Sequence, residues 1–389
     1  MSVTAPDGFV AGGAACGIKA SGQLDLAVVA TADARAVPAA GVFTANLAPA
    51  APVLVSRAHL AATGGRAAGV VVNAGNANAA TGIAGRAKAE RTAALVASTL
   101  GTASEEVLVC STGIIGVPLP LERLDAAIPP LVAALVPDEA AATAAATAIM
   151  TTDTAVKETR VEADGFVVGG MGKGAAMLAP DMATMLAVLT TDALVDPAAL
   201  APMLRDAVAR SFNAVSIDGC TSTNDTVLVL ASGSAGPVDE EAVSEALHDA
   251  CADLAGQMVA DAEGATRVVQ IAVSGAADDA EARRACRRVA DSALVKCSMY
   301  GGDPYWGRVM SELGSAGVSF DPERVSISYG GVTTCRKGVA AAHDDAAVRS
   351  HLAGKHVELH ADLGLGSGAA VVLTADLGPG YIDENMRTS

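Results

Sequence analysis

Short apolar runs alternate with longer amphipathic stretches along this chain, and that alternation limits the folds open to it. The run Gly69–Asn73 is followed by a turn-rich segment and then by a stretch of helical periodicity at 85–101. A second run, Glu106–Cys110, leads directly into the string STGIIG, and Pro118 and Pro120 prevent a regular continuation beyond it. Repeated strand, loop and helix order of this kind predicts an α/β protein built in layers.

The pattern continues in the second half of the chain. Asp196 followed by Pro197 is typical of a helix start, because the first provides a cap and the second has a helical φ angle. Another helix is expected to begin near Asp239, and the apolar run Thr226–Leu230 predicts a strand between the two. The alanine-rich stretch 138–150 has high helix propensity, so we expect a helix there. The positions expected to be buried are Leu200, Met203, Leu204 and Val208 in the first helix and Leu247, Cys251, Leu254 and Met258 in the second.

Length and composition limit the number of domains, the residue types in the core and the classes of partner. A chain of 389 residues can form two domains or two closely packed halves, and with 51% hydrophobic but 3% aromatic residues its core must consist mainly of Ala, Val, Leu and Met. The formal net charge of −17 disfavours nucleic acid and anionic membranes as partners. The most apolar segment, Met177–Leu189, contains Pro180 and Asp181 and is shorter than the roughly 18 to 20 residues that span a bilayer. The first residues do not resemble a secretory signal, so we expect a cytoplasmic protein.

The seven cysteines and six histidines form no recognisable metal or catalytic motif. The cysteines are scattered without a CxxC pair, so we expect neither disulfides nor a zinc site, and buried reduced thiols instead. Four of the histidines fall within 343–360, a charged stretch typical of a surface. Because the chain also has no GxSxG motif, a histidine base is not expected. A catalytic base would have to be another group.

Two glycine-rich strings do not fit the nucleotide-binding motifs that they approach. In the string 170–174 (GMGKG), Val167 and Gly174 stand where a phosphate-binding loop needs glycine and a hydroxyl residue. The string 364–368 (GLGSG) lacks the third glycine of the dinucleotide fingerprint, which favours a turn.

The segment 169–193 (GGMGKGAAMLAPDMATMLAVLTTDA) carries the most chemical information. Thr184 follows a Pro/Asp turn and begins the strongly apolar segment Met185–Leu189, where its hydroxyl could attack the carbonyl of Ala183. Hydrolysis of the resulting ester would leave Thr184 as a new N-terminus, whose α-amine, with a pKa of about 7.7 to 8.0, could accept the proton of its own hydroxyl. Taken alone, the same residues also fit a threonine that only packs at a strand start and a solvated Lys173 in a glycine loop.

The string KGAAMLAPDMATMLAVLTTDA resembles the signature of the ArgJ family, the ornithine acetyltransferases or glutamate N-acetyltransferases, which cleave themselves at an Ala-Thr bond. The resemblance extends over nearly the whole chain. The matching strings are NAGNANA at 73–79, STGIIG at 111–116, IMTTDT at 149–154, SFNAVSIDG at 211–219, TSTNDT at 221–226, DAEGAT at 261–266, LVK at 294–296 and DPYWGR at 303–308. Tyr305 stands where the family usually has Asn, Cys220 replaces an acidic residue, and the tail after Asn385 is shorter than usual.

The resemblance implies a role for each matching residue. Thr184 would be the nucleophile, and the bond between Ala183 and Thr184 the cleavage site, giving an α segment, residues 1–183, and a β segment, residues 184–389. Thr112 and Gly113 would form the oxyanion hole. The substrate would be bound by Thr152, Lys173, Thr184, Glu263, Asn385 and Ser389. Lys173 would pair with a carboxylate and Glu263 with an ammonium group of the amino-acid substrate.

The implied fold is the layered α/β ArgJ/DmpA-like fold, formed by two associated segments of one precursor. The implied reaction moves the acetyl group of N2-acetylornithine to Thr184 and then to glutamate, in arginine biosynthesis, with no metal or organic cofactor. Similar proteins assemble as α2β2 units or larger. The alternatives are an enzyme that also uses acetyl-CoA, a paralogue in specialised metabolism, a related self-processing aminopeptidase, and a non-catalytic binding protein.

Overall fold

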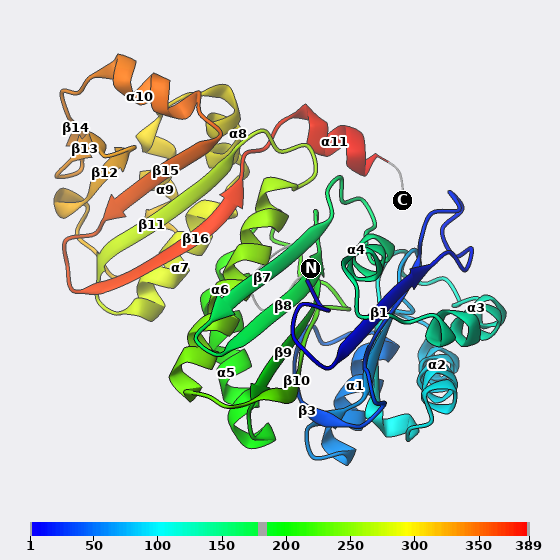
Figure 1. Cartoon of the computed structure of the whole chain (residues 1–389). Coiled ribbons are helices and arrows are strands. Elements are labelled where there is room, and N and C mark those ends of the chain that lie inside the picture. The colour runs from blue at the N-terminus through cyan, green and yellow to red at the C-terminus, as the bar shows by residue number, and fades with distance from the viewer. Residues whose placement is uncertain (1, 178–184, 387–389) are drawn as a thin grey trace. The chain divides into compact units, whose positions relative to one another are not determined.

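The computed structural model describes residues 2–177 and 185–386 of the chain. The backbone forms two compact units, which are described separately (Figure 1). The first unit holds the residues up to Asn213 together with Cys220–Met258, and the second holds Ala214–Gly219 and the residues from Val259 on. This division differs from the expected cleavage segments, because the expected cleavage site lies within the first unit.

Two β-sheets form the centre of the first unit. The four-stranded sheet has the order β1-β2-β5-β6 and consists of β1 (Phe9–Ala14), β2 (Leu26–Thr31), β5 (Gly69–Asn73) and β6 (Val107–Ser111). The six-stranded sheet has the order β4-β3-β10-β9-β8-β7 and consists of β4 (Arg66–Ala67), β3 (Val37–Phe43), β10 (Thr226–Pro237), β9 (Leu186–Leu194), β8 (Phe166–Lys173) and β7 (Lys157–Ala163). Within it, β9 pairs parallel with β10 and antiparallel with β8.

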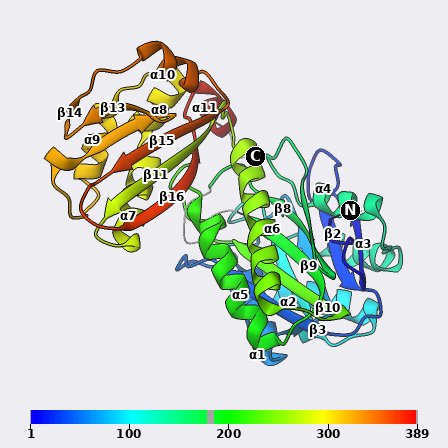
Figure 2. The ribbon, with the colours of Figure 1, turned by 60° about the vertical axis from the view of Figure 1, so that its left-hand side comes forward.

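Helices cover both outer faces of these sheets, so the first unit has four layers. The helices of the first unit are α1 (Ala51–Ala62), α2 (Gly82–Leu100), α3 (Leu121–Ala133), α4 (Glu139–Ala148), α5 (Pro197–Arg210) and α6 (Glu240–Ala260, ending just past the boundary), with the short turns η1 (Ser104–Glu106) and η2 (Phe212–Ala214). Helices α1, α2 and α3 pack on the four-stranded sheet, and α5 and α6 lie along the six-stranded sheet (Figure 2).

Side-chain alternation explains why the two sheets are buried between helices. On β2, Val28 packs toward the helices and Val29 toward the other sheet. On β9, Leu186 and Val188 face the four-stranded sheet. A strand buried on both faces needs a continuous apolar run, which is what the expected strand at 185–189 provided.

The glycines of β8 allow close packing across this strand. A Cβ at Gly169 would lie 1.9 Å from the carbonyl oxygen of Ser2, and one at Gly172 would lie 2.8 Å from the Met258 side chain of α6. The alternative of a glycine loop around Lys173 is therefore wrong, because Gly169, Gly170 and Gly172 are strand residues whose missing side chains make room for neighbours.

The second unit is one sheet with helices packed against it. The sheet has the order β14-β13-β12-β15-β11-β16 and consists of β14 (Val339–Ala340), β13 (Val332–Arg336), β12 (Ser326–Tyr329), β15 (His356–Asp362), β11 (Val268–Ala276) and β16 (Gly368–Ala375). The helices are α7 (Asp279–Ala290), α8 (Ala293–Gly301), α9 (Trp306–Gly314), α10 (Asp345–Leu352) and α11 (Pro379–Asn385), with the turn η3 (Pro322–Arg324). Strand β15 alternates buried and exposed residues, as expected of a strand with one face in a core.

Most of the expected elements are confirmed. Asp196 caps α5 by accepting a hydrogen bond from the Ala198 nitrogen, and Asp138 caps α4 in the same way through Ala141. Residues 364–367 form a bend between β15 and β16, as expected of the string 364–368, whose last residue begins β16. The expectation of buried thiols is confirmed for Cys110, Cys251, Cys286 and Cys335 but wrong for Cys220 and Cys297, which are exposed, and Cys16 is half-buried. Within the described residues, no helix is both long and apolar enough to cross a membrane.

The packing around β8 predicts opposite effects for two glycine substitutions. Gly169→Ala should lower the free energy of unfolding by about 1–3 kcal/mol, because the added methyl group meets backbone that must shift. Gly256→Ala in α6 should raise it by about 0.5–1 kcal/mol, because nothing lies within 4 Å of the new Cβ and alanine is the better helix former. Urea unfolding of the two variants and the wild type measures both changes. Equal effects of the two substitutions would contradict the packing described for β8.

Candidate active site

A tight loop after β6 presents Thr112 and Gly113. The backbone nitrogen of Thr112 donates a hydrogen bond to the Asn73 carbonyl at 3.0 Å, so only its hydroxyl remains as a donor. Gly113 has a φ of 125° and a Cβ there would lie 2.3 Å from the Gly75 carbonyl carbon, so glycine is required at this position. Among the described residues, no acceptor takes its N–H. The loop therefore offers one hydroxyl and one backbone N–H, two donors of the kind that bind an oxyanion.

Buried amide side chains hold this loop in place. The Asn224 side chain donates to the Ser111 carbonyl at 2.8 Å and to the Ala77 carbonyl at 2.7 Å. Ser111 in turn donates to the Asn73 side chain at 2.6 Å. The strings NAGNANA and TSTNDT are thus joined through the loop, a role that the sequence analysis did not assign to their asparagines.

Lys173 ends β8 and extends toward the same loop. Its ammonium group donates a hydrogen bond to the Thr112 hydroxyl at 3.3 Å, and the residue is 2% exposed. The alternative of a solvated lysine is therefore wrong. Because a lysine ammonium only donates, the Thr112 hydroxyl accepts this bond and keeps its own proton available for another acceptor.

Asp153 balances the buried charge around Lys173. Its carboxylate forms an ion pair with Lys157 at 2.7 Å between two fully buried side chains, and it accepts the backbone N–H groups of Gly174 at 2.8 Å and Thr151 at 3.0 Å. Burial alone would raise the pKa of Asp153, but the ammonium groups of Lys173 and Lys157 outweigh it and hold that pKa at about 2. The sequence analysis missed both Asp153 and Lys157.

Thr152 is half-buried. Its neighbours Thr151 and Asp153 line a cavity of about 470 Å³, whereas Thr152 itself is not among the lining residues. The other lining residues are Gly22, Gln23, Leu24, Thr147, Met150, Thr154 and Val156. The cavity is large enough for an amino-acid side chain or more.

The expected nucleophile and cleavage site, Thr184 and Ala183, lie outside the described residues, as does Ser389. The description resumes at Met185, whose backbone nitrogen donates to the Asp225 carboxylate at 2.8 Å and whose carbonyl accepts from Thr226 at 3.2 Å. Among the described residues of the first unit, the structure therefore brings Thr112, Gly113 and Lys173 together.

In the second unit, two of the expected substrate-binding residues contact each other. The Asn385 side chain of α11 donates to the Glu263 carboxylate at 2.7 Å. Gly264, beside Glu263, has a φ of 65°, and a Cβ there would lie 2.1 Å from the Tyr381 nitrogen, so this glycine lets α11 approach. Tyr305, one of the departures from the family pattern, is exposed and contacts Arg308 through its ring.

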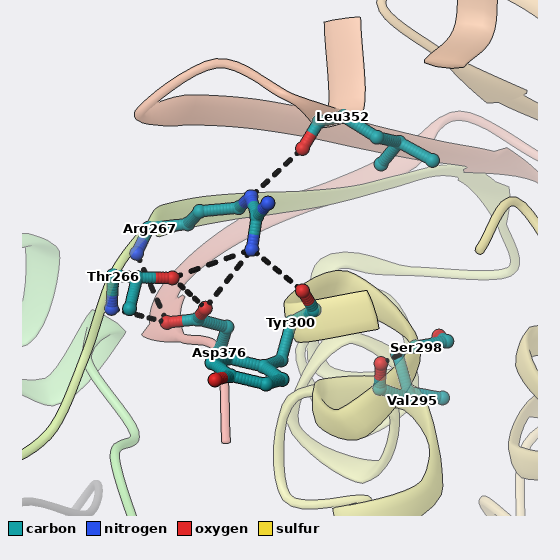
Figure 3. Close-up of polar contacts among 7 residues, drawn as sticks. All are labelled: Thr266, Arg267, Val295, Ser298, Tyr300, Leu352 and Asp376. Carbon is teal, nitrogen blue, oxygen red and sulfur yellow. Dashed lines mark hydrogen bonds and ion pairs between the residues drawn. The ribbon is translucent and has the colours of Figure 1, made fainter. Parts of the chain in front are cut away.

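A buried carboxylate fixes the segments that carry Glu263 and α11 (Figure 3). Asp376 accepts hydrogen bonds from the Thr266 and Arg267 nitrogens at 2.7 and 2.9 Å, and also from the Thr266 hydroxyl. The Arg267 guanidinium contacts Asp376 at 3.3 Å and donates to the carbonyls of Tyr300 and Leu352. Because the Nε and Nη1 groups of Arg267 and two backbone N–H groups are all bonded, this group holds the start of β11 beside the end of β16 in one geometry.

A layered α/β fold with a hydroxyl and a glycine N–H on one loop, next to a buried lysine, is the arrangement of an acyl-transfer enzyme. The model of the ArgJ family matches residues 10–388, and the chain therefore belongs to the ArgJ family. The predictions of this family, of its α/β fold and of an acyltransferase of arginine biosynthesis are confirmed.

Two relatives and one solved structure illustrate this membership. The arginine biosynthesis bifunctional protein ArgJ of Mycobacterium tuberculosis H37Rv is 46% identical, with 100% of this chain and 96% of the relative covered. The protein of the same name from Thermobifida fusca is 45% identical, with 100% of both chains covered. The crystal structure of arginine biosynthesis bifunctional protein ArgJ from Bacillus halodurans is 32% identical, with a TM-score of 0.50, covering 54% of this chain and 99% of the other.

The buried Asp153 predicts a large stability loss on substitution. Asp153→Ala should lower the free energy of unfolding by about 3–5 kcal/mol, because it leaves the Lys157 ammonium group buried without this carboxylate. Asp33→Ala is the control. It removes an exposed ion pair with Arg35 and should cost less than about 1 kcal/mol.

The same carboxylate gives the expected pH dependence. Its pKa is lower in the folded chain than the roughly 3.9 of an unfolded chain, so its stabilisation is complete above about pH 4 and is lost as the pH falls toward 2. Urea unfolding across this range should show that loss for the wild type and a smaller one for Asp153→Ala. Identical pH profiles would contradict the ion pair.

Proposed function

We propose that this chain is an acetyltransferase that moves the acetyl group of N2-acetylornithine to glutamate through an acetyl-Thr184 intermediate, after self-cleavage between Ala183 and Thr184. The observation that carries the proposal is the Thr112–Gly113 loop with Lys173 hydrogen-bonded to it at 3.3 Å. Family membership over nearly the whole chain supports the choice of reaction and substrates.

The proposed reaction needs a nucleophile, a base and two oxyanion donors. The α-amine of cleaved Thr184 accepts the hydroxyl proton, and Oγ attacks the acetyl carbonyl of the donor. The Thr112 hydroxyl and the Gly113 N–H stabilise the negative charge on the carbonyl oxygen, and the nearby Lys173 ammonium strengthens the Thr112 hydroxyl as a donor. Ornithine leaves, and the amine of glutamate then takes the acetyl group from Thr184.

The proposed substrate contacts involve both segments. Lys173 and Thr152 would bind the carboxylate end of the amino acid, and Thr151 and Asp153, next to Thr152 in the chain, line a cavity. Glu263 would pair with an ammonium group of the substrate, and Asn385 would orient the Glu263 carboxylate through their 2.7 Å hydrogen bond. Ser389 would also bind the substrate at this end. No cofactor takes part in these steps.

Two observations support cleavage into segments 1–183 and 184–389 that remain associated. The Bacillus halodurans chain matches almost completely to 54% of this chain, so it has about the length of one segment. Strand β8 before the proposed cut and β9 after it are paired from Lys173–Leu186 to Val168–Thr191, so a cut chain stays within one sheet. We propose an α2β2 assembly or larger, acting in the cytoplasm.

A second activity is favoured by the names of the relatives, which are called bifunctional. We propose that the enzyme also transfers acetyl from acetyl-CoA to glutamate. An assay of the purified protein with glutamate and acetyl-CoA, without N2-acetylornithine, tests this. A paralogue in specialised metabolism would fail to rescue an arginine auxotroph, and an aminopeptidase would release free acetate without an amine acceptor.

Removal of the proposed nucleophile should abolish both cleavage and transfer. Thr184→Ala should give one uncut chain without acetyl transfer, as measured by intact mass and by formation of N-acetylglutamate. Thr191→Ala, on β9, removes a hydroxyl that donates to the Val167 carbonyl, and this variant should cut normally. Two normal fragments from Thr184→Ala would rule out this nucleophile.

Removal of one oxyanion donor should slow turnover more than it weakens binding. Thr112→Ala should lower kcat by about 10²–10³-fold and change KM by less than about threefold, because the hydroxyl contacts the charge that develops in the transition state. Thr112→Ser keeps the hydroxyl and should stay within about tenfold of the wild type. A Thr112→Ala variant with normal kcat and a raised KM would show instead that the loop binds substrate.

A further inference from the structure

Self-cleavage requires a proton acceptor that the mature enzyme does not need. In the uncut chain the nitrogen of Thr184 belongs to a peptide bond, and an amide nitrogen is not a base at neutral pH. The α-amine that serves as base in the proposed acetyl transfer therefore forms only after the cut. Another group must take the Thr184 hydroxyl proton when the precursor cleaves itself.

Asp225 has a buried carboxylate directly before β10, the strand that pairs with β9. The residue is 0% exposed, and β10 pairs with β9 from its first residue. Its Oδ1 accepts the Met185 N–H at 2.8 Å. Its Oδ2 is buried and has no hydrogen-bond partner among the described residues. Burial of a carboxylate oxygen without a hydrogen bond lowers the stability of the folded chain, so its presence suggests a functional role.

Covalent geometry limits how far the reacting atoms can be from this carboxylate. Thr184 is bonded to the Met185 nitrogen, so its own nitrogen and its hydroxyl lie within about 4 Å of that nitrogen in any conformation. The Met185 nitrogen is itself 2.8 Å from Asp225. The covalent chain therefore keeps the Thr184 hydroxyl within about 7 Å of the Asp225 carboxylate.

The neighbours of Asp225 tie it to the oxyanion loop. Its carbonyl accepts the Thr44 N–H at 3.0 Å, which fixes the backbone. Asn224, the preceding residue, holds the Ser111 and Ala77 carbonyls. Residues 224 and 225 thus connect the loop that would stabilise an oxyanion with the backbone that adjoins the cleavage site.

We infer that Asp225 is the proton acceptor of the self-cleavage step, distinct from the α-amine that acts in acetyl transfer. The inference rests on the proposed function, since it requires cleavage before Thr184. The Asp225 carboxylate takes the Thr184 hydroxyl proton as Oγ bonds to the Ala183 carbonyl carbon. The bond from that carbon to the Thr184 nitrogen then breaks, and Asp225 returns the proton to this nitrogen, giving an amine and an ester. A water molecule hydrolyses the ester to the Ala183 carboxylate and the Thr184 hydroxyl.

The two buried carboxylates of the first unit near Lys173 differ in basicity. Burial raises the pKa of Asp225 well above its ordinary value, although the Met185 N–H, the Lys173 ammonium and the Ser222 hydroxyl oppose this. The pKa of Asp153 is held at about 2 by two lysines, so Asp153 is a poor proton acceptor. A carboxylate whose pKa is shifted toward neutrality accepts a proton more readily.

Asp225→Asn tests the inference, because asparagine keeps an acceptor for the Met185 N–H but cannot take up the proton. Full-length chains are made by cell-free translation, and the fragments are followed over time on denaturing gels. We expect Asp225→Asn to be cut at least 100-fold more slowly than the wild type. Asp192→Asn is the matched control. It changes a buried carboxylate of β9 that binds two backbone N–H groups, and it should be cut at the wild-type rate.

Asp225→Glu keeps the inference testable if the asparagine variant does not fold. The glutamate variant retains a carboxylate and should be cut measurably, more slowly than the wild type. Thermal unfolding of Asp225→Asn is compared with that of Thr184→Ala, another uncut chain, to verify folding. Cutting of Asp225→Asn at the wild-type rate, or no cutting of folded Asp225→Glu, overturns the inference.

The same gels separate this inference from the proposed function. If the wild type itself remains uncut while active, the proposed cleavage fails and the inference falls with it. If the wild type and Asp192→Asn are cut and Asp225→Asn is cut equally fast, only the role of Asp225 is lost.

Discussion

Burial of β9 on both faces is the constraint on which the first unit depends. The strand lies in the middle of the six-stranded sheet, between β8 and β10, with the four-stranded sheet on one side. Its eight residues from Leu186 to Ala193 are all buried. Such a position fixes the register of β9 against its neighbours, because a shift by one residue would move each side chain to the opposite face of the sheet. The chemistry proposed for the preceding residue needs this precision.

The elements of the fold followed from local patterns. The apolar runs at 69–73 and 106–110, the capped helix start at Asp196 and the helix expected at 138–150 were predictable from the sequence, because each rests on a short-range rule. Strand β8 was not, since its glycines are typical of a loop in isolation. Only the neighbouring Ser2 backbone and α6 explain why side chains are missing there.

The residues of the candidate site likewise include some that the sequence predicted and others that only the structure revealed. The Thr112–Gly113 loop was identified from a family string, and its geometry gives the physical reason for the glycine. Asp153, Lys157, Asn224 and Asp225 were missed, because each acts through a partner that is distant in the sequence or through burial that no local pattern reports. A buried lysine such as Lys173 needs counter-charges, and the acidic residue of the TTDT string, Asp153, could have been suggested on that ground.

The antiparallel pairing of β8 with β9 across the proposed cut has a consequence for the lifetime of the protein. A precursor folds as one polymer, in which closing the loop between the two strands is unimolecular and independent of concentration. If the chain is cut as proposed, the same strands belong to separate polypeptides, and reassembly from the unfolded state becomes a bimolecular encounter. Loss of structure in the mature form is then hard to reverse at low concentration, so its persistence in the cell is governed by how slowly it opens rather than by how well it refolds.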